Sequence, residues 1–263
     1  MNITLPDGSI REMVPGTNGL DLANNIGPGL AKAAIAVVVN GVQRDLCDPI
    51  HEDSDVSIIT IDSDEGLEIM RHTLTAQVLA RAVKNLYPGT KLAIGPTITD
   101  GFYYDFELEK SISNDDLASI EKEMKKIISN NSSITKSLHT KAEAITVFES
   151  EEEPYKKSII DDSEQEDNFQ LYYQDDSKFV DLCRGPHLPN LKYIGAFKLT
   201  KLAGAYWKGD SKNKMLTRIY GTAWKNEKDL AAYLTRLEEA EKRDHRKLGK
   251  EMNLFHFQEE APG

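Results

Sequence analysis

The dipeptide Asn40-Gly41 constrains the fold of this chain more than any other feature, because Asn-Gly after an apolar run is the strongest short-range signal for a β-hairpin. The apolar run in front of it is Ile35–Val39. The other elements expected around this hairpin are a strand at 3–5, a return strand at 10–14, helical stretches at 20–26 and 30–34, and a closing strand at 56–61. A hairpin, a helix and further strands within about 60 residues predict a β-grasp roll.

A polar boundary at residues 63–66 separates this roll from a second, larger unit. Apolar side chains then recur at spacings of three and four, which predicts a helix over 67–86 that a Pro-Gly pair ends. Residues 115–129 form a second amphipathic helix with polar capping residues in front. Further along we expect a strand at 101–106, a short helix at 139–149, a partly looped acidic stretch at 151–167, strands within 171–180, short strands with glycine turns at 192–224, and a long charged helix at 226–249.

From the residues alone these patterns predict a small β-grasp unit, a larger unit of mixed helices and strands after the polar boundary, and a long charged helix. The α+β class of the larger unit at 63–225, the linker role of the helix at 226–250 and the terminal segment at 251–263 are implied by the family resemblance given below. The charge is uneven along the chain. The 263 residues carry a formal net charge of −11, which argues against a general nucleic-acid binder. Residues 149–181 hold twelve acidic and three basic side chains, whereas 201–250 hold thirteen basic and seven acidic ones, so the C-terminal fifth could contact phosphates.

Two observations concern the cellular setting. No apolar run approaches the roughly 18 to 20 residues that cross a bilayer, and the start of the chain has no basic region followed by an apolar stretch, so we expect neither a membrane span nor a secretory signal. The two cysteines, Cys47 and Cys183, lie far apart in the sequence. This disfavours a disulfide framework and indicates a reducing, cytoplasmic setting.

The segment Cys183-Arg184-Gly185-Pro186-His187 is the most unusual in the chain. Its Gly-Pro pair disfavours a helix, so we expect a turn that presents the Cys and His side chains together. Such a pair can bind a metal, activate a nucleophile or position a water. A buried thiol and a hydrogen-bonded imidazole under a loop are equally consistent with it. With His72 added, the set would also make three zinc ligands.

Two further groups admit both structural and functional interpretations. Lys156 interrupts an acidic stretch, and it is either a solvated counter-charge or a cation that holds a phosphate, a ribose or a water. In the strand at 101–106, Tyr103 and Tyr104 point to opposite faces. Either ring could stack on a base, although aromatic side chains at strand spacing more often belong to the core.

Several motifs together resemble bacterial threonyl-tRNA synthetase over essentially the whole chain. The motifs are Ile3–Gly8, Ile26–Ala31, Gly101–Asp105, Cys183–His187, Asn213–Leu216, Arg218–Trp224 and Lys242–Lys247. Taken alone, Gly101–Asp105 and Cys183–His187 also resemble editing domains of the alanyl-tRNA synthetase type.

The resemblance implies a TGS domain at 1–62, an editing domain at 63–225 with a second additional region at about 170–220, and a linker helix toward a class II catalytic core. The chain ends where that core would begin. We therefore expect no aminoacylation by this chain and no cofactor in it, because ATP and zinc are implied only for the core. The implied partners are the acceptor end of tRNA(Thr), seryl-tRNA(Thr) and the catalytic core of the same enzyme. A monomer is expected for this chain and a homodimer for the intact enzyme, with no membrane partner.

Editing has an energetic reason. Serine lacks one methyl group of threonine, which is worth only about 1–3 kcal/mol, so a threonine site admits serine and a second site must remove it. By resemblance, this second site hydrolyses seryl-tRNA(Thr) without a metal, and its lining residues are His72, Lys156, Asp181, Cys183 and His187. A histidine can orient and deprotonate the attacking water near neutral pH. We expect Cys183 to shape the pocket or position water rather than attack.

The chain departs from the family in the first helix of this domain, where the family has His-x-x-x-His. The segment Arg71–Leu79 lacks the second histidine and looks one residue longer. If His72 keeps the first position, Ala76 takes the second; if the downstream register is kept, Thr73 and Gln77 take the two positions. In an α-helix, residues five apart are about 140° apart, so His72 and Gln77 would not share a face. Glutamine is no base at neutral pH. The alternative function is therefore a tRNA acceptor-arm binding module with an inactive editing site.

Other positions are expected at the edges of the site. The candidate pocket residues are Thr73, Gln77, Gly95 and Tyr104, and the candidate RNA-binding residues are Lys208, Lys212, Lys214, Arg218 and Arg236.

Overall fold

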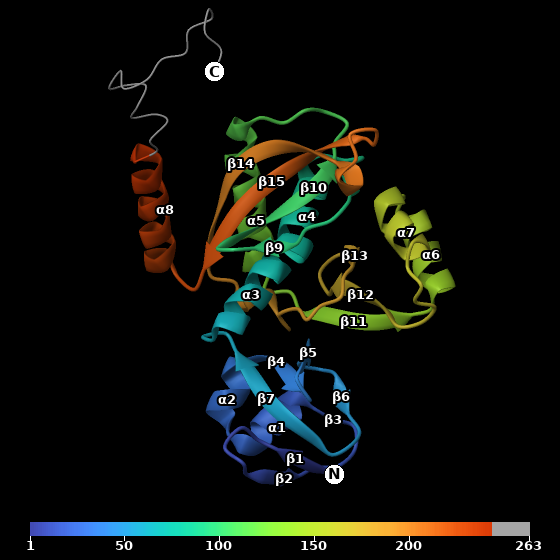
Figure 1. The fold of residues 1–263 in the computed structure, drawn as a ribbon, viewed down its shortest axis with the longest axis vertical. Coiled ribbons are helices and arrows are strands. Elements are labelled where there is room, and N and C mark those ends of the chain that lie inside the picture. The colour runs from blue at the N-terminus through green and yellow to red at the C-terminus, as the bar shows by residue number, and fades with distance from the viewer. Residues whose placement is uncertain (244–263) are drawn as a thin grey trace, which may run out of the picture.

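The N-terminal unit folds around the predicted hairpin in the structure, a computed structural model that describes residues 1–243. Asn40 and Gly41 have φ of 49° and 81°, the positive values that a tight hairpin turn requires at both central positions. The flanking strands are β4 (Ala34–Val39) and β5 (Val42–Asp45). The five-stranded sheet has the order β2-β1-β7-β4-β5, and β1 pairs parallel to β7. This arrangement confirms the β-grasp roll (Figure 1).

The other predicted elements of this unit are present as β1 (Asn2–Thr4), β2 (Ile10–Glu12), α1 (Gly19–Ile26), α2 (Pro28–Ala33) and β7 (Ser54–Thr60). Two short strands that the sequence did not predict, β3 (Thr17–Asn18) and β6 (Pro49–Ile50), pair with each other. The side chains of Asn18 and Asp21 form a capping box that fixes the start of α1. The buried Leu22 of this helix packs with Ile3 and Val37 of the sheet, which gives the unit a core of its own.

One long helix leads from the N-terminal unit into the second unit. It consists of α3 (Asp64–Thr73), a π-helical segment (Leu74–Leu79) and α4 (Ala80–Leu86), and Ser63 caps its start. Figure 1 shows α3 rising from the N-terminal roll and α4 lying behind the large sheet of the second unit. The predicted helix at 67–86 is therefore confirmed, but the α-helical geometry assumed for its middle is wrong.

The large sheet contains β14 (Ala196–Tyr206), β15 (Met215–Trp224), β10 (Gly101–Glu107) and β8 (Lys91–Leu92) in this order, and β9 (Thr97–Ile98) also pairs with β10. The short strands expected at 192–224 are instead two long ones. The prediction is wrong because Gly204 and Gly221 lie inside paired strands and not in turns. Gly221 lies inside β15, where a Cβ atom would come within 2.4 Å of the Phe102 ring, so this glycine permits close packing.

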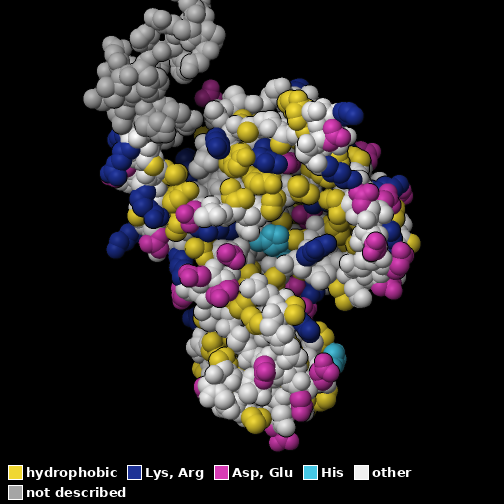
Figure 2. Space-filling model, viewed as in Figure 1, with side chains coloured by type: hydrophobic (Ala, Val, Ile, Leu, Met, Phe, Trp, Pro, Cys, Tyr) yellow, Lys and Arg dark blue, Asp and Glu magenta, His cyan; other side chains and the backbone are white. Residues whose placement is uncertain are grey.

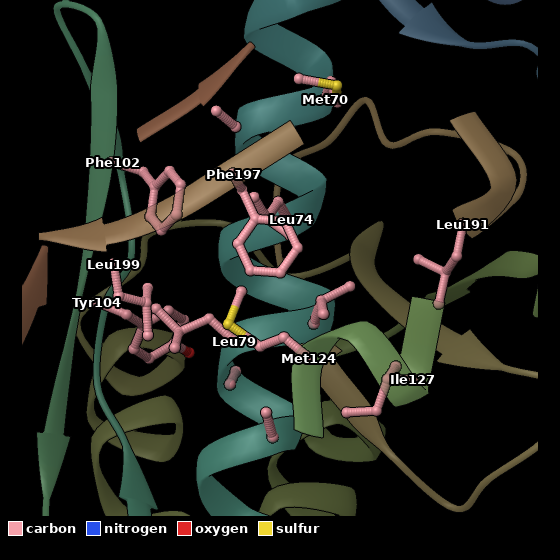
Figure 3. Close-up of a cluster of buried hydrophobic side chains, with 14 of the residues drawn as sticks. Met70, Leu74, Leu79, Phe102, Tyr104, Met124, Ile127, Leu191, Phe197 and Leu199 are labelled. Carbon is pink, nitrogen blue, oxygen red and sulfur yellow. The ribbon is translucent and has the colours of Figure 1, made fainter. Parts of the chain in front are cut away.

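The core of the second unit lies between this sheet and the helices. Figure 3 shows Leu74 and Leu79 of the long helix, Met124 of α5 (Leu117–Ser129), and Phe102 and Phe197 of the sheet converging on it. The same hydrophobic cluster takes in Ile35 and Ile59 of the N-terminal unit, so the two units share buried surface.

A smaller lobe completes the second unit. Its sheet has the order β11 (Ile134–His139), β12 (Phe169–Gln174) and β13 (Val180–Leu182), and it carries α6 (Lys141–Ser150) and α7 (Pro154–Asp161) (Figure 1). The acidic stretch at 151–167 was expected to be partly loop, and α7 fills half of it. Pro154 occupies the first turn of α7, where the missing N–H costs no hydrogen bond.

The last described helix is α8 (Glu227–Lys242), which packs on β14 and β15. It is the start of the helix predicted for 226–249. The rest of that helix beyond residue 243 and the terminal segment 251–263 lie outside the described residues. No helix among residues 1–243 is both long and apolar enough to cross a membrane.

Candidate functional site

A cavity of about 650 Å³ opens between the long helix, β10, α7 and the end of β13. Figure 2 shows this face of the molecule hollowed between the large sheet and the α6–α7 lobe, with a histidine exposed beside the hollow. The sequence-predicted residues that line the cavity are His72, Gly95, Tyr104, Lys156, Asp181 and Cys183. The fold therefore brings together residues that are up to 111 positions apart, as in the pair His72 and Cys183.

His72 and Cys183 are in direct contact. His72 Nε2 lies 2.8 Å from Cys183 Sγ, and both side chains are half-buried at the cavity wall. The Cys183–His187 segment is non-helical, as its Gly-Pro pair predicts, and is called the turn below. Cys183 lines the cavity, whereas His187 does not. Gly185 has a φ of +62°, and a Cβ atom there would lie 2.0 Å from the hydroxyl of Tyr172, so this position requires glycine.

His187 lies behind His72 rather than in the cavity wall. The two imidazole rings stack with centroids 4.6 Å apart and planes 5° apart. Thr73 Oγ1 accepts the N–H of Leu188 and lies 3.1 Å from His187 Nδ1. His187 Nε2 is buried and has no hydrogen-bond partner among residues 1–243.

A buried ion pair forms the opposite wall. Lys156 Nζ lies 2.6 Å from Asp181 Oδ1 and 5.5 Å from the centroid of the Tyr104 ring. Lys156 is 3% exposed, which excludes the solvated counter-charge considered from the sequence. Burial opposes its charge, but the Asp181 carboxylate more than offsets this, so the pKa of Lys156 lies above its usual value. The site therefore holds a fixed cation.

The environment of His72 lowers the pKa of its side chain, whereas that of Lys156 is raised. Burial lowers the pKa of His72, and the carboxylates of Asp181 and Asp45 oppose this only in part. His72 is consequently neutral at pH 7 and can accept a proton. A neutral imidazole and a buried ammonium group that face the same cavity can together activate a water and polarise a carbonyl.

The π-helical segment decides between the two registers considered for the long helix. Ala76 lines the cavity with His72, whereas Thr73 and Gln77 are fully buried. Gln77 faces Gln174, whose amide nitrogen lies 2.7 Å from the Gln77 carbonyl oxygen and 3.2 Å from its Oε1. A π-helix accommodates one extra residue per turn, so the helix keeps its packing on both sides of the insertion. Thr73 and Gln77 therefore do not line the cavity, and Ala76 occupies the position next to His72.

His72, Cys183 and His187 are also a possible metal set, since their donor atoms lie within 4.8 Å of one another. The distances and ring orientations in this set do not favour zinc. Tetrahedral zinc would hold a nitrogen and a sulfur ligand roughly 3.5 Å apart, whereas the His72–Cys183 contact is a 2.8 Å hydrogen bond. The stacked rings of the two histidines do not converge on one point. The set would have to rearrange to bind a metal.

Sequence reasoning missed much of the cavity lining. The additional lining residues include Ile94, Pro96, Ile159, Phe169, Gln170 and Arg184. Only Arg184 could have been found from the sequence, because it lies within the Cys183–His187 segment. The others come from segments that the sequence presents as loop, helix or strand without polar motifs, and only the tertiary fold brings them together.

The candidate RNA-binding residues lie mostly in ion pairs of their own. Lys208 pairs with Asp162, Lys214 pairs with Glu107, and Arg218 forms a two-pronged pair with Asp105 at 2.6 and 2.8 Å. Arg236 lies over the Trp224 ring at 6.0 Å. Lys212 is exposed and forms no ion pair within residues 1–243. Three of the five cations are thus partly neutralised by carboxylates of the chain itself.

Comparison with known families identifies two segments. Residues 1–60 match the TGS domain, and residues 170–220 match the second additional domain of threonyl and alanyl tRNA synthetases. The second match contains Asp181, Cys183 and His187 and ends within β15. The pair of domains fits the N-terminal region of a synthetase of the threonyl or alanyl type, and it points to a region concerned with tRNA binding and editing.

Proposed function

We propose that this chain is the proofreading region of a threonine–tRNA ligase and that it hydrolyses seryl-tRNA(Thr). One observation carries the proposal: His72 and Cys183 are in contact in the wall of a cavity that the buried Lys156–Asp181 pair also lines. The two family matches support a tRNA-linked substrate. The partners that follow are the acceptor end of tRNA(Thr) and the catalytic core of the same ligase.

The chemistry is hydrolysis of an ester. Neutral His72 takes a proton from a water as the water attacks the ester carbonyl. In this step the His72 Nε2–H donates to Cys183 Sγ, which leaves Nδ1 as the proton acceptor. Lys156 stabilises the negative charge that develops on the carbonyl oxygen. The C–O bond of the ester breaks, His72 returns the proton to the oxygen of the 3′-terminal ribose to form its hydroxyl, and serine leaves with a free carboxyl group.

The test compares serine release from seryl-tRNA(Thr) by the wild-type chain, a His72→Ala variant and a His51→Ala variant. His51 is an exposed histidine of the TGS domain, so it is the matched control. We expect release by the wild type and by His51→Ala, and a loss of about a hundredfold or more in His72→Ala. Release that survives in His72→Ala would contradict the assigned role of His72.

A second candidate function is a binding module, and Ala76 favours it. This small side chain takes the cavity position next to His72 and supplies no second imidazole. A wild-type chain that binds tRNA(Thr) but releases no serine above the uncatalysed rate would establish this function instead.

A further inference from the structure

A carboxylate of the TGS domain contacts residues that lie behind the wall of the editing cavity. Asp45 ends β5 and is 6% exposed. Its Oδ1 accepts the backbone N–H of His187 at 2.9 Å. Its Oδ2 accepts the hydroxyl of Tyr172 at 2.7 Å and the ammonium of Lys136 at 2.9 Å. Every one of these three donors belongs to the second unit.

Asp45 holds His187 in two ways. The N–H of His187 is buried, and a buried amide without an acceptor is costly, so the position of this backbone depends on the Asp45 carboxylate. The imidazole of His187 packs edge-on against the Tyr172 ring with centroids 4.4 Å apart, and the same carboxylate fixes the Tyr172 hydroxyl. A Cβ atom at Gly185 would lie 3.2 Å from Asp45 Oδ2, so Gly185 packs closely against this carboxylate.

We propose that Asp45 is a positioning residue for the editing reaction. Through this residue the TGS domain holds the turn that carries His187, behind the wall of the editing cavity. This inference rests on the proposed function. Asp45 orders His187 and, through the stacked rings, His72, without touching the substrate. A displacement of about 1 Å at a reacting group can lower a rate about a hundredfold.

The chain supplies a matched control. Asp48 also pairs with Lys136, and it accepts the backbone N–H of Asp45 at 3.2 Å, but it makes no hydrogen bond to His187 or Tyr172. An Asp48→Asn variant therefore removes an equal charge from the same contact between domains without releasing the turn. An Asp45→Asn variant keeps one acceptor oxygen for His187 and presents its amide N–H₂ toward Lys136, so its effect should be smaller than that of Asp45→Ala.

The experiment measures kcat and KM for serine release by the wild type and the three variants, with folding checked by thermal melting. We expect kcat to fall about 10- to 100-fold in Asp45→Ala and about 3- to 10-fold in Asp45→Asn, with KM within about threefold of the wild type. Asp48→Asn should keep kcat within about twofold. A wild-type kcat in a folded Asp45 variant, or an equal loss in Asp48→Asn, overturns the proposal. If Asp45→Ala does not fold, the Asp45→Asn result decides.

A second readout separates this proposal from the proposed function. Amide hydrogen exchange at His187 reports the hydrogen bond to Asp45 and needs no catalysis. We expect it to accelerate about tenfold or more in Asp45→Ala and to stay unchanged in Asp48→Asn. If the wild type releases no serine, the proposed function fails while faster exchange still supports Asp45 as the support of the turn. Unchanged exchange in Asp45→Ala overturns the positioning role.

Discussion

At the scale of single residues, the proposed hydrolysis depends on the protonation state of His72. The side chain lies half-buried against Cys183, and burial lowers its pKa below the usual value near 6.5. A histidine with a lowered pKa stays neutral to a lower pH than a free imidazole does. The proton acceptor is therefore present at pH 7 and is lost only when the pH falls through the lowered pKa.

This protonation predicts the pH dependence of serine release. The rate should hold as the pH drops to about 6.5 and decline only at lower pH, because protonation of His72 removes the base. The measurement is kcat/KM between pH 5 and 8, corrected for uncatalysed ester hydrolysis. A rate that already falls between pH 8 and 7 would contradict a neutral His72 as the base.

A second residue-scale prediction concerns Ala76. A histidine there would place a second imidazole at the cavity wall next to His72, since Ala76 is a lining residue. Serine release should rise about tenfold or more in Ala76→His, within the range that a positioned acid or base contributes. The control is Gln77→His, whose site is fully buried against Gln174. An equal gain in Gln77→His, or none in a folded Ala76→His, would refute the assigned register.

At the scale of elements, periodicity predicted the long helix and the β-grasp roll, because both depend on local spacing and on turn residues such as Asn40-Gly41. It could not predict the π-helical segment, since the extra residue is accommodated by a change in backbone hydrogen bonding that leaves the apolar spacing nearly intact. It also misplaced Gly221, because a glycine that permits close packing and a glycine in a turn look the same in a sequence.

In the candidate site, too, local features could be predicted from the sequence and long-range contacts could not. The turn at 183–187 followed from its Gly-Pro pair, and the site residues followed from a family resemblance. The burial of Lys156 against Asp181 did not, because only tertiary packing separates a buried ion pair from a solvated one. The contacts of Asp45 could not be predicted either, since its hydrogen-bond partners lie between 91 and 142 positions away in the sequence.

The turn itself gives an element-scale prediction. Gly185→Ala must force a side chain into left-handed backbone and against the Tyr172 hydroxyl, whereas Gly8→Ala has the same kind of backbone, with a φ of +80°, and open space around its Cβ. We expect Gly8→Ala to lower the free energy of unfolding by about 1 kcal/mol and Gly185→Ala by about 3 kcal/mol or more. Urea unfolding measures both. Equal losses would mean that the turn is not packed as described.

At the scale of the whole molecule, charge limits how tRNA is held. The chain is acidic overall, and three of the five candidate RNA-binding cations are engaged with its own carboxylates. The cations best placed to contact phosphates are then Lys212 and Arg184, the second of which lies at the cavity wall. Binding of tRNA by this chain should depend on few phosphate contacts.

The salt dependence of tRNA binding tests this count. Each phosphate contact contributes a slope of about −0.7 to −0.9 to log K against log[salt], so two or three contacts predict a slope of about −1.4 to −2.7 between 50 and 200 mM salt. Filter binding or fluorescence anisotropy with tRNA(Thr) measures it. A slope near zero would exclude a phosphate-contacting face, and a slope much steeper than about −5 would mean that the ion-paired cations also bind.

The central claim is that this cavity hydrolyses the ester of serine and spares that of threonine. The most direct measurement is deacylation of seryl-tRNA(Thr) and threonyl-tRNA(Thr) by the same preparation under the same conditions. We predict that serine is released at least about tenfold faster than threonine, because one methyl group is worth about 1–3 kcal/mol in discrimination. Equal rates for the two esters, or no release of serine above the uncatalysed rate, would contradict it.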